Sequence, residues 1–229
     1  MEDRNSDNLL RVNPGFGKPR FSKKEIIDIT ISVVVLSVAF TILHRNNQAF
    51  LFYFSGTLGE SMQYVGLFGT CLVVVFMSFL LHEFGHKFVA QNHGLWSEYR
   101  MWPAGLVLTL ITSFLGFLFA APGAVMIAGN MDSETNGKIS IAGPIVNIII
   151  SAIGIIGCFT INYSGWVILV FMLGNLNAFL ALFNLLPVPP LDGSKIVSWN
   201  PIIWVIAIAI AAVEVYVMMF CIPALYVVV

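Results

Sequence analysis

Residues 79–87 read Phe79-Leu80-Leu81-His82-Glu83-Phe84-Gly85-His86-Lys87 and place two imidazoles and a carboxylate in a segment apolar enough to lie in a membrane. His82 and His86 are four residues apart, so on a helix they stand on one face with Glu83 beside them. In this H-E-x-x-H pattern the two histidines hold Zn²⁺, and the glutamate accepts a proton from the water that attacks a carbonyl. The alternative is a chance match in a helix. It is disfavoured here, because each ionisable group in an apolar membrane segment costs about 3 kcal/mol without a compensating ligand.

The composition is that of a membrane protein. The 229 residues are 58% hydrophobic and 10% charged, with a mean hydropathy of +0.89, which is far outside the range of a soluble domain. We therefore expect a polytopic protein surrounded by the lipid bilayer. Residues 1–25 hold a cluster of Lys and Arg, and the positive-inside rule predicts a basic cytoplasmic tail there. The remaining chain is sparsely charged, which argues against a nucleic-acid partner.

Five apolar runs are long enough to cross a bilayer. They cover residues 26–43, 65–90, 139–161, 166–186 and 202–220. We expect residues 26–229 to form a single membrane-embedded domain, with a core at 65–199 and the histidines nearer the cytoplasmic face. Ser22 and Glu25 predict a helix-capping pair before the first run. Residues 91–102 have the Trp- and Tyr-rich composition of a turn at the level of the lipid headgroups.

Residues 105–129 could either cross the membrane or re-enter it and return to the same side. Pro122 and Gly123 break any helix in the second half of this segment. A full crossing would place the histidine motif and Asp192 on opposite sides of the membrane, whereas a re-entrant segment places them on one face. The second topology also keeps the basic residues of the loops cytoplasmic. We therefore predict a re-entrant helix and β-strand segment, covered by protein or lining a water-filled cavity.

A catalytic zinc typically has three protein ligands and an open position, so a third ligand is needed. Asp192 is the best candidate, because it follows helix-breaking prolines and shares a face with the histidines in the re-entrant topology. The alternative is an ordinary turn aspartate, since Asp-Gly is a common turn pair. His93 is excluded, because it stands eleven residues after His82 where extended motifs require ten. Asn184 could direct its amide at a developing oxyanion.

Two further features remain open. Glu214 is an acid within the last apolar run, where it either serves function or pairs with another helix. The small residues and amides of the third and fourth runs predict close helix packing and interhelical hydrogen bonds.

Three motifs taken in order resemble the site-2 protease family of intramembrane zinc metalloproteases. They are His82-Glu83-Phe84-Gly85-His86, Gly143-Pro144-x-x-Asn147, and Asn184-Leu185-Leu186-Pro187-Val188-Pro189-Pro190-Leu191-Asp192-Gly193. The resemblance implies an all-α polytopic protein with about five transmembrane helices around a three-helix catalytic core. It implies one Zn²⁺ per chain held by His82, His86 and Asp192, with Glu83 as general base and Asn184 assisting at the oxyanion. It also implies β-strands between the first two core helices that pair with an unwound substrate, which fits residues 121–129. The sequence has room for neither a PDZ nor a CBS domain.

These features predict an intramembrane metalloprotease whose partner is a transmembrane protein substrate. Two rival hypotheses are a non-catalytic binding or regulatory protein with the same fold, and a metal transporter, since intramembrane His, Asp and Asn can line an ion path. A transporter predicts ligands spread along a path rather than one tight cluster. The oligomeric state is left open by the sequence.

Overall fold

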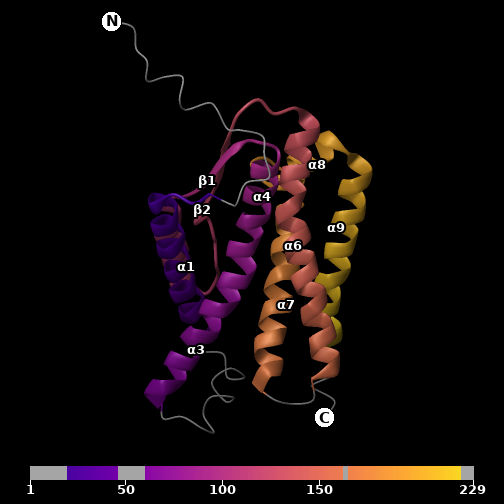
Figure 1. Cartoon of the computed structure of the whole chain (residues 1–229). Helices are drawn as coiled ribbons and strands as arrows, with labels where there is room; N and C mark the ends of the chain where they lie inside the picture. The colour runs from indigo at the N-terminus through magenta and orange to yellow at the C-terminus, as the bar shows by residue number, and fades with distance from the viewer. Residues whose placement is uncertain (1–19, 46–59, 162–164, 223–229) are drawn as a thin grey trace, which may run out of the picture.

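The computed structural model describes residues 20–45, 60–161 and 165–222 (Figure 1). Within these ranges five helical spans are long and apolar enough to cross a membrane, which confirms the prediction of an all-α, multi-pass membrane protein. The spans are Lys23–His44 (α1), Met62–Asn92, Ser133–Thr160 (α6), Trp166–Asn184 within α7 (Gly165–Asn184), and Pro201–Cys221, which joins α9 (Pro201–Tyr216) to the π-helical turn η2 (Val217–Cys221). Most of the expected basic tail, residues 1–19, lies outside the described residues.

Capping residues determine where two of the spans begin. Ser22 caps α1 as predicted, since its Oγ accepts the backbone N–H of Glu25 at 3.1 Å. The side chain of Glu25 does not return to the cap, however, and instead binds Lys87 Nζ and the backbone N–H of Tyr99. Helix α6 begins six residues earlier than expected, because Asp132 Oδ1 accepts the backbone N–H of Thr135 at 2.8 Å and extends the helix beyond its apolar part.

The second span is one continuous helix built from three segments, with a π-helical turn just before the histidine motif. The segments are α3 (Glu60–Val75), η1 (Phe76–Leu80) and α4 (Leu81–Asn92). A π-turn changes the backbone hydrogen-bonding pattern and often lies at a functional site. Here the carbonyl of Ser78, within the turn, accepts a hydrogen bond from the Asn147 side chain of α6 at 3.0 Å. The turn thus contributes a polar group at the level of the histidines.

Residues 91–102 are not the simple turn that their composition suggested. They include strand β1 (Trp96–Met101), which pairs antiparallel with β2 (Gly123–Ala128). Ser97 and Tyr99 are buried while Trp96 is exposed, so the aromatic residues lie on the two faces of a strand. The predicted strand at residues 121–129 is confirmed by β2.

The segment between the two strands leaves the sheet and returns to it. It begins with α5 (Pro103–Phe114), whose 12 residues make a helix about 18 Å long, too short to cross a bilayer. The ends of the segment meet where the N–H of Trp102 donates to the carbonyl of Pro122 at 2.8 Å. This is the arrangement predicted for a re-entrant segment.

Helices α4, α6 and α7 lie side by side as a three-helix core (Figure 1). Their contacts depend on glycines: a Cβ on Gly85 of α4 would lie 2.9 Å from Ala142 O of α6, and one on Gly154 of α6 would lie 2.5 Å from Gly174 Cα of α7. The C-termini of α4 and α7, the N-terminus of α6, the sheet and the short helix α8 (Asp192–Trp199) gather at one end of the molecule (Figure 1). The histidine motif and Asp192 therefore share a face, as the re-entrant topology predicts.

Candidate metal centre and active site

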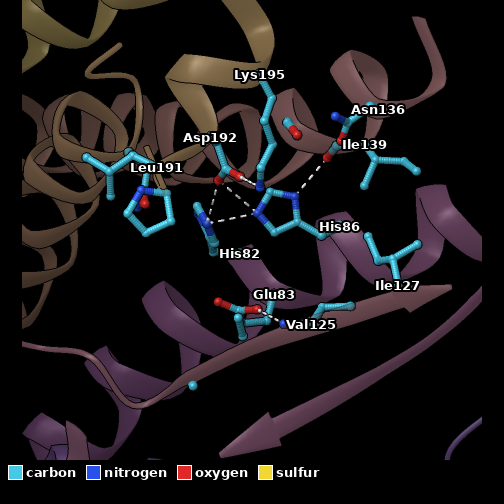
Figure 2. Close-up of a pocket in the computed structure, with 15 residues that line it drawn as sticks. His82, Glu83, His86, Val125, Ile127, Asn136, Ile139, Leu191, Asp192 and Lys195 are labelled. Carbon is cyan, nitrogen blue, oxygen red and sulfur yellow. Dashed lines mark hydrogen bonds and ion pairs between the residues drawn. The ribbon is translucent and has the colours of Figure 1, made fainter. Parts of the chain in front are cut away.

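The structure brings together two histidines and one aspartate from distant parts of the chain. His82 Nε2 and His86 Nε2 lie 3.6 Å and 3.1 Å from Asp192 Oδ2, and the two nitrogens are 3.1 Å apart. Figure 2 shows both imidazoles directed toward Asp192. One ligand atom from each residue lies within 4.8 Å of the others, and all three side chains are nearly buried. Such a set of converging donors is suited to a metal ion.

Asp192 reaches the histidines because helix α8 begins against the end of α7. Asp192 is the first residue of α8, and a Cβ on the following Gly193 would lie 2.1 Å from the carbonyl oxygen of Leu185. Only a glycine permits this approach. The Asp-Gly pair is therefore part of a helix start packed on the core, rather than an ordinary surface turn.

Hydrogen bonds on the far side of each ring orient the imidazoles. His82 Nδ1 bonds Asn147 Oδ1, and His86 Nδ1 bonds the carbonyl oxygen of Ile139 at 2.7 Å. A carbonyl oxygen only accepts, so His86 Nδ1 carries the proton and its Nε2 presents a lone pair to the cluster. The same tautomer follows for His82, because the amide nitrogen of Asn147 donates to Asn177 Oδ1 at 2.7 Å, which leaves Oδ1 of Asn147 as the acceptor.

Asn147 and Asn177 form a buried hydrogen-bond network behind His82 whose end point the sequence did not reveal. The amides of the third and fourth apolar runs predicted interhelical hydrogen bonds, and the Asn147–Asn177 bond between α6 and α7 confirms this. Asn177 Nδ2 in addition donates to Ser78 Oγ at 2.7 Å. What the pattern did not indicate is that this buried network ends on His82. The spacing of Gly143 and Asn147 was the available signal, because residues four apart share one face of a helix. Partners of this kind fix the orientation of a metal-binding histidine.

Helix α6 also forms one wall of the cluster. A Cβ on Gly143 would lie 2.4 Å from His86 Nε2 and 2.7 Å from His82 Nε2, so the glycine leaves space directly in front of the ligand atoms. Two imidazole nitrogens with free lone pairs, one carboxylate and open space beside them match the three ligands and open position of a catalytic zinc. The residues present therefore fit Zn²⁺.

Electrostatics favour the ionised form of Asp192. Although burial opposes the charged form, the positive charge that the imidazoles of His86 and His82 carry when protonated outweighs it and holds the pKa of the Asp192 carboxyl well below its usual range. Its second oxygen, Oδ1, lies 3.4 Å from Lys195 Nζ. Asp192 is thus an anionic ligand with one oxygen directed at the histidines and the other at a lysine.

Glu83 and strand β2 complete the surroundings of the cluster. Glu83 Oε2 accepts the backbone N–H of Val125 at 3.1 Å (Figure 2). A cavity of about 190 Å³ contains the cluster, Glu83 and the edge of β2, and Asn184 lies on its wall. The Asn184 amide donates to Leu180 O of its own helix at 2.9 Å and makes no hydrogen bond to the cluster. The structure thus places Asn184 at the cavity without showing its role.

Two other acidic or basic candidates lie elsewhere. His93 is exposed, and its Nδ1 bonds Val89 O at 2.8 Å, so it stays at the end of α4 as the spacing predicted. Glu214 is buried in α9 near Ser151 of α6, outside the cavity of the cluster, and neither its Oε2 nor the Ser151 Oγ has a hydrogen-bond partner among the described residues. Among the described residues, His82, His86 and Asp192 form the one group of three or more His, Cys, Asp or Glu able to hold a metal.

Replacing Asp192 by alanine is expected to weaken zinc binding by more than about 100-fold. Loss of an outer hydrogen-bond partner typically costs about 10–100-fold in affinity, and loss of a ligand itself should exceed this. Competition titration with a chromophoric chelator measures the affinity. The matched control is Asp132→Ala, which removes a helix cap on the exposed start of α6. Wild-type affinity in Asp192→Ala would rule out Asp192 as the third ligand.

Comparison with known proteins points to one family. A family model described as peptidase family M50 matches residues 159–222, which include Asn184 and Asp192. The chain is 38% identical over 190 residues to "Putative zinc metalloprotease MJ0611" of Methanocaldococcus jannaschii, which covers 82% of this chain and 90% of that protein. It is 31% identical over 150 residues to "Zinc metalloprotease MJ0392" of the same organism, covering 64% of this chain and 39% of that one. No solved structure matches the chain significantly.

Proposed function

The chain belongs to peptidase family M50, the site-2 protease family, and we propose that it hydrolyses peptide bonds within or next to transmembrane segments of other membrane proteins. The observation that carries this proposal is the buried cluster of His82, His86 and Asp192 beside Glu83, inside a protein with five candidate membrane spans. A substrate within the bilayer would have to reach this site from the membrane-spanning part of the protein. The expected substrate is therefore a transmembrane protein.

His82, His86 and Asp192 would hold one Zn²⁺, which supplies Lewis acidity for the attacking water and for the carbonyl that it attacks. Glu83 accepts the proton of the attacking water and delivers it to the leaving amine. The Val125 N–H fixes one oxygen of this carboxylate at the edge of the cavity. We propose that Asn184, which lies on the cavity wall, donates its amide to the oxyanion, a task that asparagine performs in other hydrolases.

The edge of β2 offers a place for an unwound substrate. Gly123, Val125 and Ile127 line the cavity, and the opposite edge of β2 is already paired with β1. A helical substrate hides its peptide bonds within its own hydrogen bonds, so it must be extended before attack. An extended segment added to this edge gains backbone hydrogen bonds from the groups that Glu83 does not already bind, and these bonds replace those of the helix. This edge would hold the scissile bond close to Glu83.

The site is proposed to lie nearer the cytoplasmic face, with the N-terminus cytoplasmic. The start of α1, the sheet, the start of α6 and α8 share one end of the molecule (Figure 1). These elements carry Lys23, Arg100, Lys138 and Lys195. The positive-inside rule favours placing such an end in the cytoplasm.

One tight cluster favours catalysis over metal transport. In the part of the chain that the structure describes, the candidate ligands converge within 4.8 Å rather than following a path across the membrane. A non-catalytic relative of the same fold would not require Glu83 beside the cluster. Activity decides between these functions.

The deciding experiment reconstitutes the purified protein in liposomes with a mixture of membrane proteins and identifies new termini by mass spectrometry. We expect cleavages within or next to transmembrane segments, their loss on chelation, and their recovery when zinc is restored. In the same assay, Asn184→Ala should lower kcat by about 10²–10³-fold with little change in KM. Zinc flux without cleavage would favour the transporter, and an unchanged kcat in Asn184→Ala would remove Asn184 from the mechanism.

A further inference from the structure

Glu25 of α1 binds both α4, the helix that carries the histidine motif, and strand β1. Glu25 is fully buried, and Lys87 Nζ lies 2.8 Å from its Oε1 and 3.0 Å from its Oε2. Glu25 Oε1 also accepts the backbone N–H of Tyr99 in β1 at 2.9 Å. Lys87 itself donates to Ser97 O of β1 at 2.8 Å. Three acceptor atoms thus surround the three donor hydrogens of a fully buried ammonium.

Glu83 binds the sheet from the side opposite Glu25, at the β2 residue that is paired with Tyr99. Tyr99 and Val125 are partners in the β1–β2 register, yet each donates its N–H away from the other strand. Tyr99 donates to Glu25, and Val125 donates to Glu83. The Tyr99–Val125 pair of the sheet therefore lies between two glutamates, Glu25 of α1 and Glu83 of α4.

These contacts close a ring. Lys87 follows Glu83 by four residues, so both stand on the face of α4 that is directed at the sheet. The ring consists of the Glu25–Lys87 ion pair, helix α4 from Lys87 to Glu83, the Glu83–Val125 hydrogen bond, the Val125–Tyr99 strand pairing and the Tyr99–Glu25 hydrogen bond. A two-stranded sheet is marginally stable by itself, so its position depends on what holds its edges. This ring fixes β2 relative to the catalytic carboxylate.

Helix α1 covers the outer edge of β1 along its length. Besides Glu25, Ser32 Oγ accepts the hydroxyl of Tyr99 at 2.9 Å, and Asp28 Oδ2 lies 3.9 Å from Arg100 Nη1. The three α1 residues are spaced by three and four positions and so form one polar stripe on the helix. Because the stripe binds β1, β2 is the strand of the sheet that faces the cavity.

We propose that Glu25 is a positioning residue for proteolysis: through Lys87 and Tyr99 it sets where a peptide bound on β2 lies relative to Glu83. This inference rests on the proposed function. It gives α1 a part in the reaction although α1 contributes no ligand to the metal centre. A displacement of about 1 Å at the reacting groups can lower a rate about 100-fold, so a shifted β2 would still bind peptide but would present the wrong bond.

The test compares Glu25→Gln with the wild type in liposomes containing a transmembrane substrate that the wild type cleaves. We expect kcat to fall by about 10–100-fold with KM changed less than about threefold, zinc content to remain near one ion per chain, and cleavage to spread to neighbouring bonds. Glu25→Asp, which retains the charge, should recover part of the rate. Asp28→Asn is the matched control on the same stripe, since Asp28 pairs with Arg100 of β1 rather than with Lys87, and it should cleave at the wild-type position.

A readout that needs no activity is hydrogen exchange of the β2 amides at residues 123–128. Exchange there should accelerate in Glu25→Gln while α6 stays protected, because the ring holds the sheet and not the core. If the unpaired Lys87 prevents folding, Glu25→Gln/Lys87→Gln removes the charge and should show the same shift. A folded variant with wild-type kcat, cleavage position and β2 exchange would overturn the positioning role. An inactive wild type would count against the proposed function alone, and β2 exchange would still test the ring.

Discussion

Glu83→Gln is expected to lower peptide hydrolysis by about 10²–10⁴-fold while zinc content stays near one ion per chain. Positioned general acid–base catalysis contributes about this factor, and an amide cannot accept the proton of the attacking water. The substitution is nearly isosteric, and its amide oxygen can still accept the Val125 N–H, which is 3.1 Å from the carboxylate in the structure. The fold and the metal centre should therefore persist.

Cleavage of a reconstituted transmembrane substrate and zinc content by elemental mass spectrometry are the two measurements. Glu214→Gln is the matched control, because Glu214 is also a buried intramembrane glutamate but belongs to α9, away from the cavity. It should cleave at nearly the wild-type rate. Equal cleavage by Glu83→Gln and the wild type would contradict the protease proposal. Loss of zinc in Glu83→Gln would instead indicate that Glu83 acts on the metal centre.

Local patterns predicted much of the fold and the candidate site. Spans follow from runs of apolar residues, and the positions of His82 and His86 follow from helical spacing, since both depend on neighbours within a few residues. The prediction that the histidines and Asp192 lie on the same side of the membrane followed from counting how often the chain crosses it. In each case a short stretch or a simple topological rule carries the information.

The contacts that orient the site could not be predicted from the same patterns. The bond from His82 to Asn147 spans 65 residues, and the Lys87–Glu25 pair spans 62. Glu25 was predicted only as half of a helix-capping pair with Ser22, because the local sequence offers it a satisfactory local role. Strand β1 was missed for a related reason: aromatic and charged residues that alternate along a strand have the same composition as a headgroup-level turn.

Gly143→Ala is expected to remove bound zinc and abolish proteolysis without unfolding the protein. The added methyl carbon would lie 2.4 Å from His86 Nε2 and 2.7 Å from His82 Nε2, closer than real side-chain contacts allow. The imidazoles cannot yield freely, because Asn147 and the carbonyl of Ile139 hold their Nδ1 atoms. The methyl group therefore occupies the space before both ligand nitrogens, and the effect should exceed that of losing Asp192 alone.

Gly69→Ala separates this effect from the general consequences of adding a methyl group to a helix. Gly69 lies in α3, and a Cβ there would meet nothing within 4 Å. Replacing a helix-interior glycine by alanine should by itself stabilise the protein by about 0.5–1 kcal/mol, so thermal unfolding should show that neither variant is globally destabilised. Zinc content then discriminates: near one ion per chain in Gly69→Ala and near zero in Gly143→Ala. Wild-type zinc affinity in Gly143→Ala would mean that the ligand nitrogens do not converge in front of α6, and the candidate metal centre would have to be rebuilt around a different geometry.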